Sequence, residues 1–349
     1  MKAAVYYGKG DIRVESSFPI PSIGPSEVLV KVMACGVCGT DLHIFSGAKG
    51  ATDCNPPVIL GHEFSGIVEK VGSQVTRVQP GQRVTIDPNI SCGACDHCRN
   101  GQPHFCDAMA ATGVNYNGGF AEYCKVLERQ LFVIPDHVPF EVAAMCEPVA
   151  CCLHGIDLCG IQAGDIVMII GGGTIGMIML QLAQMSGASR TILLEPNKNK
   201  FDLAKKLGAD LVLDPFHDDV SAALREHGMN NIRVVIECVG ASGSVKNAID
   251  YAGKAATVMI FGLTGPDDSV AFKPFEAFKK ELTIKTSFVN PNTQGRARDI
   301  ITSGKLNLKD LIADHVKLDN IEDAFNPGFS KGKIVIRPWQ DDQDSSSDK

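Results

Sequence analysis

Four cysteines lie close together in the first third of the chain, and their spacing suits a metal ion. Cys92, Cys95, Cys98 and Cys106 follow the pattern C-x2-C-x2-C-x7-C within one short segment. Zinc takes four such ligands in a tetrahedron, and a shell of four thiolates leaves no position for a substrate. The pattern therefore predicts a structural zinc ion that holds a loop without a core of its own.

Two other kinds of cysteine cluster fit these residues less well. Iron–sulfur proteins use C-x2-C-x2-C-x3-C-P, whereas the last interval here is seven residues and Asp107 follows it. A zinc module that binds nucleic acid has basic surroundings, but Asp96 and Asp107 flank these ligands. We therefore expect the zinc ion to be structural.

A glycine-rich segment near the middle of the chain has the pattern of a phosphate-binding turn. Three glycines fit G-x-G-x-x-G directly after the apolar run 166–170. In such a turn the backbone approaches a pyrophosphate, and the N-terminus of the following helix faces the phosphates. The residues expected to contact a dinucleotide here are Gly171, Gly173, Thr174, Ile175 and Gly176.

The end of the next apolar run indicates which dinucleotide binds. The run 191–194 ends at Glu195, and an acid at this point accepts hydrogen bonds from ribose hydroxyls and repels a 2′-phosphate. Lys198 and Lys200 follow closely, and we expect Lys200 to lie near the cofactor. Glu195 therefore favours NAD over NADP. The alternative is that Glu195 is a solvated acid at the end of a strand.

A second set of candidate ligands is scattered along the first part of the chain. Cys38 lies in the segment Cys-Gly-Thr-Asp-Leu-His, and His62 and Glu63 follow Gly61. The pair is not a zincin motif, because Gly66 stands where H-E-x-x-H has its second histidine. Alone, His62 is more often a buried histidine with a hydrogen-bond partner than a ligand. Spacing does not join it to Cys38.

The elements that must position these residues change in character along the chain. Up to about residue 145, short β-branched runs between Gly and Pro turns indicate a β-rich domain: 28–32, 67–71 and 83–86. From about residue 165, apolar runs alternate with amphipathic helices, which indicates a parallel sheet covered on both faces: 166–170, 191–194, 234–236 and 258–261. A helix near 296–302 and a closing strand at 333–337 follow.

Length and composition limit what such a chain can do. Its 349 residues predict two domains. With 40 acidic against 33 basic residues, we expect no general attraction to nucleic acid or to an anionic membrane. The uncharged stretch 166–189 is interrupted by glycines and predicts a strand, a turn and a helix instead of a membrane span. The first seven residues have no apolar signal-peptide core, so we expect a cytoplasmic protein whose thirteen cysteines are ligands and buried thiols.

Together these motifs resemble the zinc-dependent medium-chain alcohol dehydrogenase superfamily, and within it the polyol dehydrogenases of the sorbitol type. The segments that carry the resemblance are 36–43, 61–66, the four-cysteine loop, Glu147-Pro148, and the glycine turn with Glu195. It implies a GroES-like β-rich catalytic domain formed by residues 1–147 and 288–340. It also implies a doubly wound α/β Rossmann domain formed by residues 148–287. The Asp- and Ser-rich composition of residues 341–349 predicts a disordered tail.

The resemblance also implies a catalytic zinc ion with an open side. Cys38 and His62 match two of its ligands, and Glu147 matches the third. Otherwise, Glu147 is simply a carboxylate at the start of a helix. Glu63 matches an acid that ligates the zinc or lies just behind it.

Further roles follow from the resemblance. Thr40 and His43 match a relay that takes the proton from the substrate and passes it outward, although His43 could otherwise be an ordinary surface histidine. Contacts to the nicotinamide half of the cofactor are implied for Val239, Gly262, Leu263, Phe288 and Val289.

The implied activity is oxidation of a secondary hydroxyl of a polyol, sugar or diol to a ketone by NAD, with two zinc ions per chain in a homodimer or homotetramer. Asn290 and Pro291 stand where animal sorbitol dehydrogenases carry an arginine that helps to hold the polyol. The resemblance therefore leaves the substrate open. The alternatives are a threonine-type or simple secondary-alcohol dehydrogenase, and a zinc- and NAD-binding redox sensor without catalysis.

Overall fold

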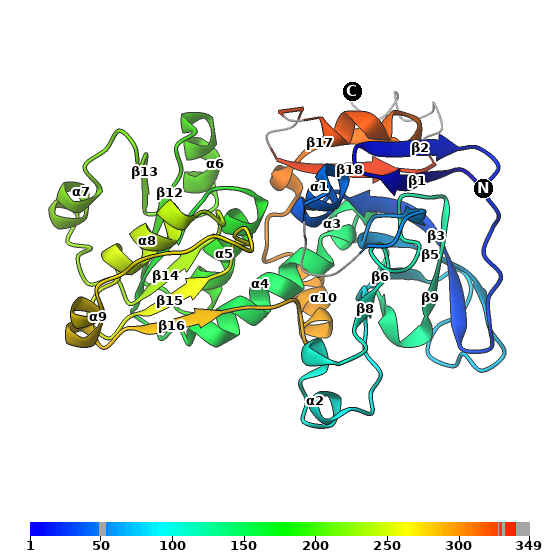
Figure 1. Cartoon of the computed structure of the whole chain (residues 1–349), viewed down its shortest axis with the longest axis horizontal. Coiled ribbons are helices and arrows are strands. Elements are labelled where there is room, and N and C mark those ends of the chain that lie inside the picture. Colours follow the sequence, from blue (N-terminus) through cyan, green and yellow to red (C-terminus); the bar gives the residue numbers. More distant parts are fainter. Residues whose placement is uncertain (49–53, 327, 330–331, 340–349) are drawn as a thin grey trace. The chain divides into compact units, whose positions relative to one another are not determined.

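The computed structural model describes all residues except 49–53, 327, 330–331 and 340–349. The chain forms two compact units, which Figure 1 shows with separate sheets. Unit 1 comprises Met1–Pro148 and Gln294–Lys349, and unit 2 comprises Val149–Thr293. The tail predicted at 341–349 lies outside the described residues.

Unit 1 consists mainly of antiparallel strands. Its largest sheet has the order β10-β6-β5-β3-β18-β17, and β9 also pairs with β3. Val28, Val30 and Val32 of β3 are fully buried, because alternate side chains of a strand face the same side of the sheet. The strands are β1 (Ala3–Gly8), β2 (Asp11–Glu15), β3 (Glu27–Gly36), β4 (Val58–Ile59), β5 (Glu63–Val71), β6 (Arg83–Ile86), β7 (Asn89–Ile90), β8 (Ala110–Ala111), β9 (Tyr123–Leu127), β10 (Leu131–Val133), β17 (Ile312–Lys317) and β18 (Lys333–Arg337).

The last strand returns to the first part of the chain. In Figure 1 the red β18 lies beside the blue β3, and the two pair antiparallel with Val335 opposite Gly36. On its other side β3 pairs with β5, and there Gly36 lies opposite Glu63. The end of β3 therefore brings together residues near 36, 63 and 333.

Short helices complete unit 1. They are α1 (Gly39–Ser46), α2 (Asp96–Arg99), α3 (Phe140–Ala144) and α10 (Gln294–Thr302), and the boundary between the units falls within α4 (Cys146–Cys159). The 3-10 helices of unit 1 are Pro103–Phe105, Glu128–Gln130, Lys309–Leu311 and Leu318–Phe325. The helix predicted near 296–302 is thus present as α10.

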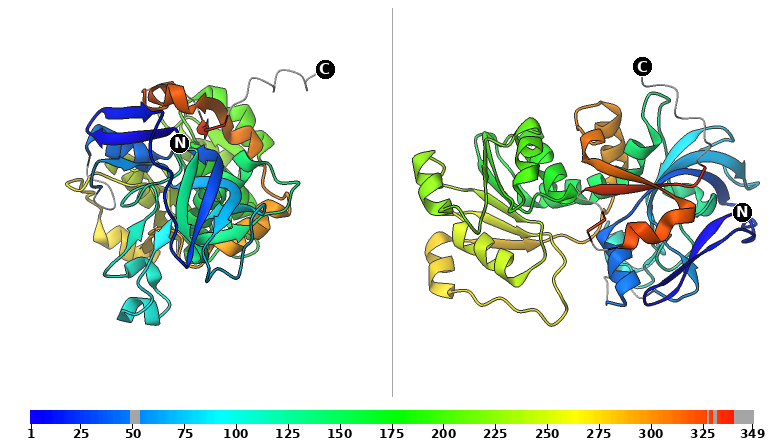
Figure 2. Two further views of the ribbon diagram at one scale, coloured as in Figure 1. Left: turned by 90° about the vertical axis from the view of Figure 1, so that its right-hand side faces the viewer. Right: turned by 90° about the horizontal axis from the view of Figure 1, so that it is seen from above.

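Unit 2 is a six-stranded sheet in which every neighbouring pair is parallel, with the order β13-β12-β11-β14-β15-β16. The central strands β11 and β14 are apolar except for Glu237 at the end of β14, because helices cover both faces of the sheet (Figure 2). The strands are β11 (Ile166–Ile170), β12 (Arg190–Leu194), β13 (Leu211–Leu213), β14 (Val234–Glu237), β15 (Thr257–Ile260) and β16 (Thr283–Thr286). The helices are α5 (Thr174–Met185), α6 (Phe201–Lys206), α7 (Val220–Glu226), α8 (Ser242–Tyr251) and α9 (Pro274–Lys280), with a 3-10 turn at Lys198–Lys200. The fold class predicted for the second half of the chain is confirmed.

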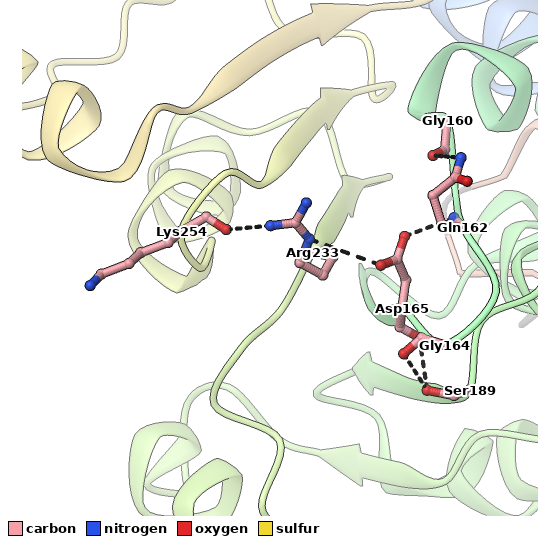
Figure 3. Close-up of polar contacts among 7 residues, drawn as sticks. All are labelled: Gly160, Gln162, Gly164, Asp165, Ser189, Arg233 and Lys254. Carbon is pink, nitrogen blue, oxygen red and sulfur yellow. Dashed lines mark hydrogen bonds and ion pairs between the residues drawn. The ribbon is translucent and has the colours of Figure 1, made fainter.

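The two ends of this sheet differ. From β11 the chain moves to β12 in one direction, and from β14 it moves to β15 in the other, so β11 and β14 flank the point where the strand order reverses. At the amino ends, Asp165 accepts a 2.8 Å hydrogen bond from Gln162 N and lies 3.9 Å from Arg233 Nε (Figure 3). Arg233 also donates to Lys254 O, at 2.8 Å. These contacts tie the loops that precede β11 and β14.

The uncharged stretch 166–189 forms β11, the glycine turn and α5, as predicted. Across the part of the chain that the structure describes, no helix combines the length and apolarity that crossing a membrane requires.

Candidate metal centres and cofactor turn

The predicted structural zinc ligands lie together in unit 1. Ligand atoms of Cys92, Cys95, Cys98 and Cys106, here called the loop cluster, all lie within 4.8 Å of one another. Cys92 is exposed and Cys106 is buried. Helix α2 starts directly after Cys95 and carries Cys98, so one short turn supplies two of the four thiols.

Backbone amides point at the sulfur atoms of the loop cluster. The amides of Ala94 and Cys95 donate to Cys92 Sγ at 3.4 and 3.3 Å. The bond from Ala94, followed by the bond from Cys95, lowers the pKa of Cys92 to about 6. Cys106 Sγ accepts from the amides of Cys92 and Ala108 at 3.2 and 3.4 Å. Four thiols gathered in this way fit a tetrahedral zinc ion.

A second group of possible ligands lies at the end of β3. Ligand atoms of Cys38, His62 and Glu63, here called the buried cluster, also lie within 4.8 Å of one another. Cys38 directly precedes α1, and Glu63 is the first residue of β5. The antiparallel register of β3 and β5 brings these two segments side by side, although they are distant in the sequence. His62 and Glu63 are both buried.

Asp41 supports the buried cluster from α1. Its side chain is fully buried, and Oδ2 accepts a 2.8 Å hydrogen bond from Cys38 N. Oδ1 lies 3.4 Å from His62 Nδ1, and neither atom makes a hydrogen bond of good geometry with the described residues. Burial lowers the pKa of His62, but Asp41 raises it, and the net result is well above the usual value. A carboxylate behind one ring nitrogen is how a metal-binding histidine is oriented, with the other nitrogen facing the cation.

Lys333 brings a positive charge to the same place. Its ammonium group forms an ion pair with Glu63 Oε2 and donates to Val37 O at 2.9 Å. Burial lowers the pKa of Lys333, but Glu63 and Cys38 raise it by more, so the ammonium group stays charged. A Cβ on Gly36 would overlap both side chains, which explains the glycine at this point of β3. Thiol, imidazole and carboxylate groups together fit a zinc ion.

The other residues predicted for this centre are on helices α1 and α4. Thr40 and His43 are on α1, one turn apart, and both are partly exposed. Glu147 is buried in the first turn of α4, but it is not one of the three residues whose ligand atoms meet in the buried cluster. Its role as third zinc ligand stays a prediction, as do the roles of Thr40 and His43.

The glycine turn of unit 2 has the features that a phosphate needs. Gly171 has φ 101°, a conformation that favours glycine, and a Cβ on Gly176 would overlap Gly171 O. A Cβ on Gly173 would meet nothing within 4 Å, so the turn is open on that side. Helix α5 starts at Thr174 without a side-chain cap, which leaves its first N–H groups available to an anion. The turn therefore fits a pyrophosphate.

Glu195 lies against this turn. It accepts hydrogen bonds from Gly172 N at 2.9 Å and Asn197 N at 2.8 Å, and Lys200 Nζ lies 3.7 Å from Oε2. Its carboxylate is thus fixed at the end of β12, beside the glycines.

The remaining predicted cofactor contacts follow other strands of the same sheet. Val239 comes after β14, Gly262 and Leu263 come after β15, and the side chains of Val239 and Leu263 are 54% and 52% exposed. Phe288 and Val289 come after β16, and Val289 has φ 47°, which is rare for a β-branched residue. Backbone strain of this kind is concentrated at binding sites.

The sequence did not lead to Asp41 and Lys333, two side chains that contact the buried cluster. Asp41 lies three residues after Cys38, and an acid in the first turn of a helix was a signal that could have found it. Lys333 had no such signal, because only the pairing of β18 with β3 brings it near Glu63.

Comparisons with known proteins agree with this geometry. Residues 24–136 match the alcohol dehydrogenase GroES-like domain, and residues 174–302 match the zinc-binding dehydrogenase domain. The chain is 33% identical over 341 residues to D-arabinitol dehydrogenase 1 of Uromyces fabae, covering 96% of this chain and 97% of the relative. It is 34% identical over 343 residues to L-threonine 3-dehydrogenase of Pyrococcus furiosus, with the same coverage.

A solved structure extends the similarity to the whole fold. A protein described as a zinc-binding dehydrogenase from Sinorhizobium meliloti 1021, bound to NADP, superimposes with a TM-score of 0.92 and 40% identity. The alignment covers 97% of this chain and 99% of that one. The predicted superfamily, with its GroES-like and Rossmann domains, is therefore confirmed, and a nicotinamide cofactor goes with it. The chain belongs to the zinc-dependent alcohol dehydrogenase family.

Proposed function

We propose that the protein oxidises a secondary hydroxyl group of a polyol, sugar or diol to a ketone, with NAD as hydride acceptor and two zinc ions per chain. The observation that carries the proposal is the meeting of Cys38, His62 and Glu63 in one buried place, with Asp41 behind the imidazole. The loop cluster would hold the second ion and take no part in the reaction.

Each residue of the buried cluster has a definite task in this reaction. A zinc ion, when bound, supplies a Lewis acid that stabilises negative charge on the substrate oxygen. Cys38, His62 and Glu147 would hold this ion. Asp41 lies beside Nδ1 of His62 and so orients the imidazole ring with its other nitrogen toward the ion. Lys333 balances the charge of Glu63, so that this carboxylate lies close without adding an uncompensated negative charge.

Helix α1 supplies the route for the proton. Thr40 and His43 are three residues apart, so their side chains are neighbours on one face of the helix. The Thr40 hydroxyl would accept the proton that leaves the substrate oxygen while it releases its own, and the cofactor ribose and the partly exposed His43 would pass that proton on toward solvent. A bound nicotinamide cofactor would supply the acceptor for the hydride from the substrate carbon.

The substrate class is tested by NAD reduction with sorbitol, xylitol, arabinitol, 2,3-butanediol and threonine. We expect the highest kcat/KM with one of the polyols or with the diol. Activity confined to threonine would reject the polyol proposal in favour of the second candidate, which the similarity to L-threonine 3-dehydrogenase of P. furiosus supports. Bound zinc and cofactor without turnover of any alcohol would instead identify a redox sensor.

The choice of NAD rests on Glu195. Its fixed carboxylate beside Gly172 would accept hydrogen bonds from ribose hydroxyls and repel a 2′-phosphate. The S. meliloti structure holds NADP, so the choice needs a direct test. We expect kcat/KM for NAD to exceed that for NADP. In Glu195→Ala the ratio of kcat/KM for NAD to kcat/KM for NADP should fall. A preference of the unmodified enzyme for NADP would reject this assignment.

Two further expectations go with the proposal. Five cysteines lie in the loop cluster and the buried cluster, where thiolates can hold metal ions, and this supports a reducing compartment such as the cytoplasm. We also propose a homodimer or homotetramer, which light scattering on the purified protein would test.

A further inference from the structure

A buried carboxylate in unit 2 has no role in the functions described above. Glu237 is the last residue of β14, and its side chain is fully buried. Because β14 flanks the point where the strand order reverses, this side chain lies at the edge where such sheets bind nucleotides. A charge buried there costs free energy unless other groups compensate it.

One oxygen of Glu237 shapes the turn that follows the strand. Oε1 accepts hydrogen bonds from Val239 N at 2.7 Å, Gly240 N at 2.9 Å and Ser244 Oγ at 2.7 Å. Three donors on one oxygen fix the carboxylate in place and set the path of the chain from β14 into α8. The half-exposed side chain of Val239 is thereby held at the end of the strand.

The second oxygen faces the neighbouring turn. Oε2 has no hydrogen-bond partner among the described residues and is shielded from solvent. A Cβ on Gly262 would lie 2.8 Å from it, and Gly262 N donates to the main-chain oxygen of Glu237 at 3.0 Å. Glu237 thus joins the turn that carries Val239 to the turn that carries Leu263.

No described cation neutralises this carboxylate. Other acids of unit 2 have such partners: Glu195 lies 3.7 Å from Lys200 Nζ, and Asp165 lies 3.9 Å from Arg233 Nε, whereas no ion pair among the described residues includes Glu237. Its negative charge therefore remains at the carboxyl edge of the sheet. In a medium of low dielectric constant such a charge acts over several ångströms.

We propose that Glu237 is a positioning residue that raises the affinity of unit 2 for the oxidised nicotinamide cofactor relative to the reduced one. The inference rests on the proposed function, because it needs the nicotinamide ring near Val239 and Leu263. That ring is positively charged when oxidised and neutral when reduced, in NAD and NADP alike. The uncompensated carboxylate attracts only the charged form, while its Oε1 holds the turns against which either form packs.

The test compares the dissociation constants of the two forms in Glu237→Gln, which keeps the shape of the side chain and removes its charge. Calorimetry gives the Kd of NAD⁺ (or NADP⁺, if the unmodified enzyme takes it), and cofactor fluorescence gives the Kd of the reduced form. We expect the Kd of the oxidised form to rise on the order of tenfold, and that of the reduced form by less than about twofold. Asp165→Asn is the matched control, because it removes a carboxylate at the opposite end of the same sheet (Figure 3) and should leave the ratio unchanged.

Two more variants separate charge from shape. Glu237→Asp keeps the charge but draws it away from the turn, so both forms should bind more weakly, and the ratio of their Kd values should change less than in Glu237→Gln. Ser244→Lys places a cation beside the intact carboxylate and should lower the preference for the oxidised form, even if Glu237→Gln does not fold. Equal weakening of both forms in Glu237→Gln, or an unchanged ratio, would overturn the proposal. An unmodified protein that binds neither form would reject the proposed function itself.

Discussion

The loop cluster and the buried cluster gather metal ligands in opposite ways. The loop cluster takes its four thiols from one short segment, and backbone amides of that segment supply hydrogen bonds to the sulfur atoms. The buried cluster takes its groups from the ends of different strands and depends on the charged side chains of Asp41 and Lys333. A local segment can therefore hold a closed site by itself, whereas a site with mixed ligands needs the fold around it and a balance of charge.

The largest difference between the clusters should appear when each loses one thiol. We expect Cys38→Ser to reduce turnover by at least about a thousandfold, because a Lewis acid contributes several kcal/mol to the transition state. Metal analysis should show about two zinc ions per chain falling to about one, with an unchanged circular dichroism spectrum. Turnover equal to that of the unmodified enzyme would show that the buried cluster is not catalytic.

The second difference concerns charge balance. Lys333→Met leaves the Glu63 carboxylate buried without its ion pair, and breaking such a pair costs about 3 kcal/mol or more in the free energy of unfolding. Urea unfolding measures the loss. Restoring the balance in the double variant Lys333→Met/Glu63→Gln should recover much of it.

The control is an ion pair on the surface. Lys246 and Asp250 are both more than half exposed, so Lys246→Met should cost no more than about 0.5 kcal/mol. A double variant as unstable as the sum of Lys333→Met and Glu63→Gln would show that the two side chains are not coupled.

Loss of a thiol from the loop cluster should affect stability and spare the chemistry. We expect Cys95→Ser to lower the free energy of unfolding by on the order of 3 kcal/mol, the contribution of an ion present at a hundred times its Kd. Thermal unfolding with and without a chelator measures it, and the residual chelator effect should then come from the buried cluster alone. A loss of turnover as large as that of Cys38→Ser would remove the distinction between the clusters.

The same contrast explains how much could be predicted from the sequence. Spacing alone led to the loop cluster, and the glycine pattern with Glu195 led to the cofactor turn, because the residues concerned are close in the sequence. The apolar runs of unit 2 matched strands such as β11 and β14, since a parallel sheet covered on both faces has continuously apolar strands.

Residues joined only by tertiary structure were out of reach. Cys38 and His62 were linked through a family resemblance, and no pattern linked Lys333 to Glu63, because that contact needs β18 beside β3. Gly36 illustrates this limit. Nothing in the neighbouring sequence explains a glycine there, and only the close approach of the Glu63 and Lys333 side chains does so.

The weakest effect is expected from a substitution beside the buried cluster that leaves all of its ligands in place. Asp41→Asn keeps the size of the side chain but removes the charge behind His62 Nδ1, and its amide can turn a donor toward that nitrogen. Partners of this kind contribute about ten- to a hundredfold to metal affinity, so we expect the ion of the buried cluster to bind that much more weakly. Competition with a chromophoric chelator measures both ions separately. Asp96→Asn is the matched control, since Asp96 is an exposed acid beside the loop cluster ligands and should change neither affinity. Equal affinities in Asp41→Asn and the unmodified protein would mean that the strands alone orient His62, and the buried cluster would then be as self-sufficient as the loop cluster.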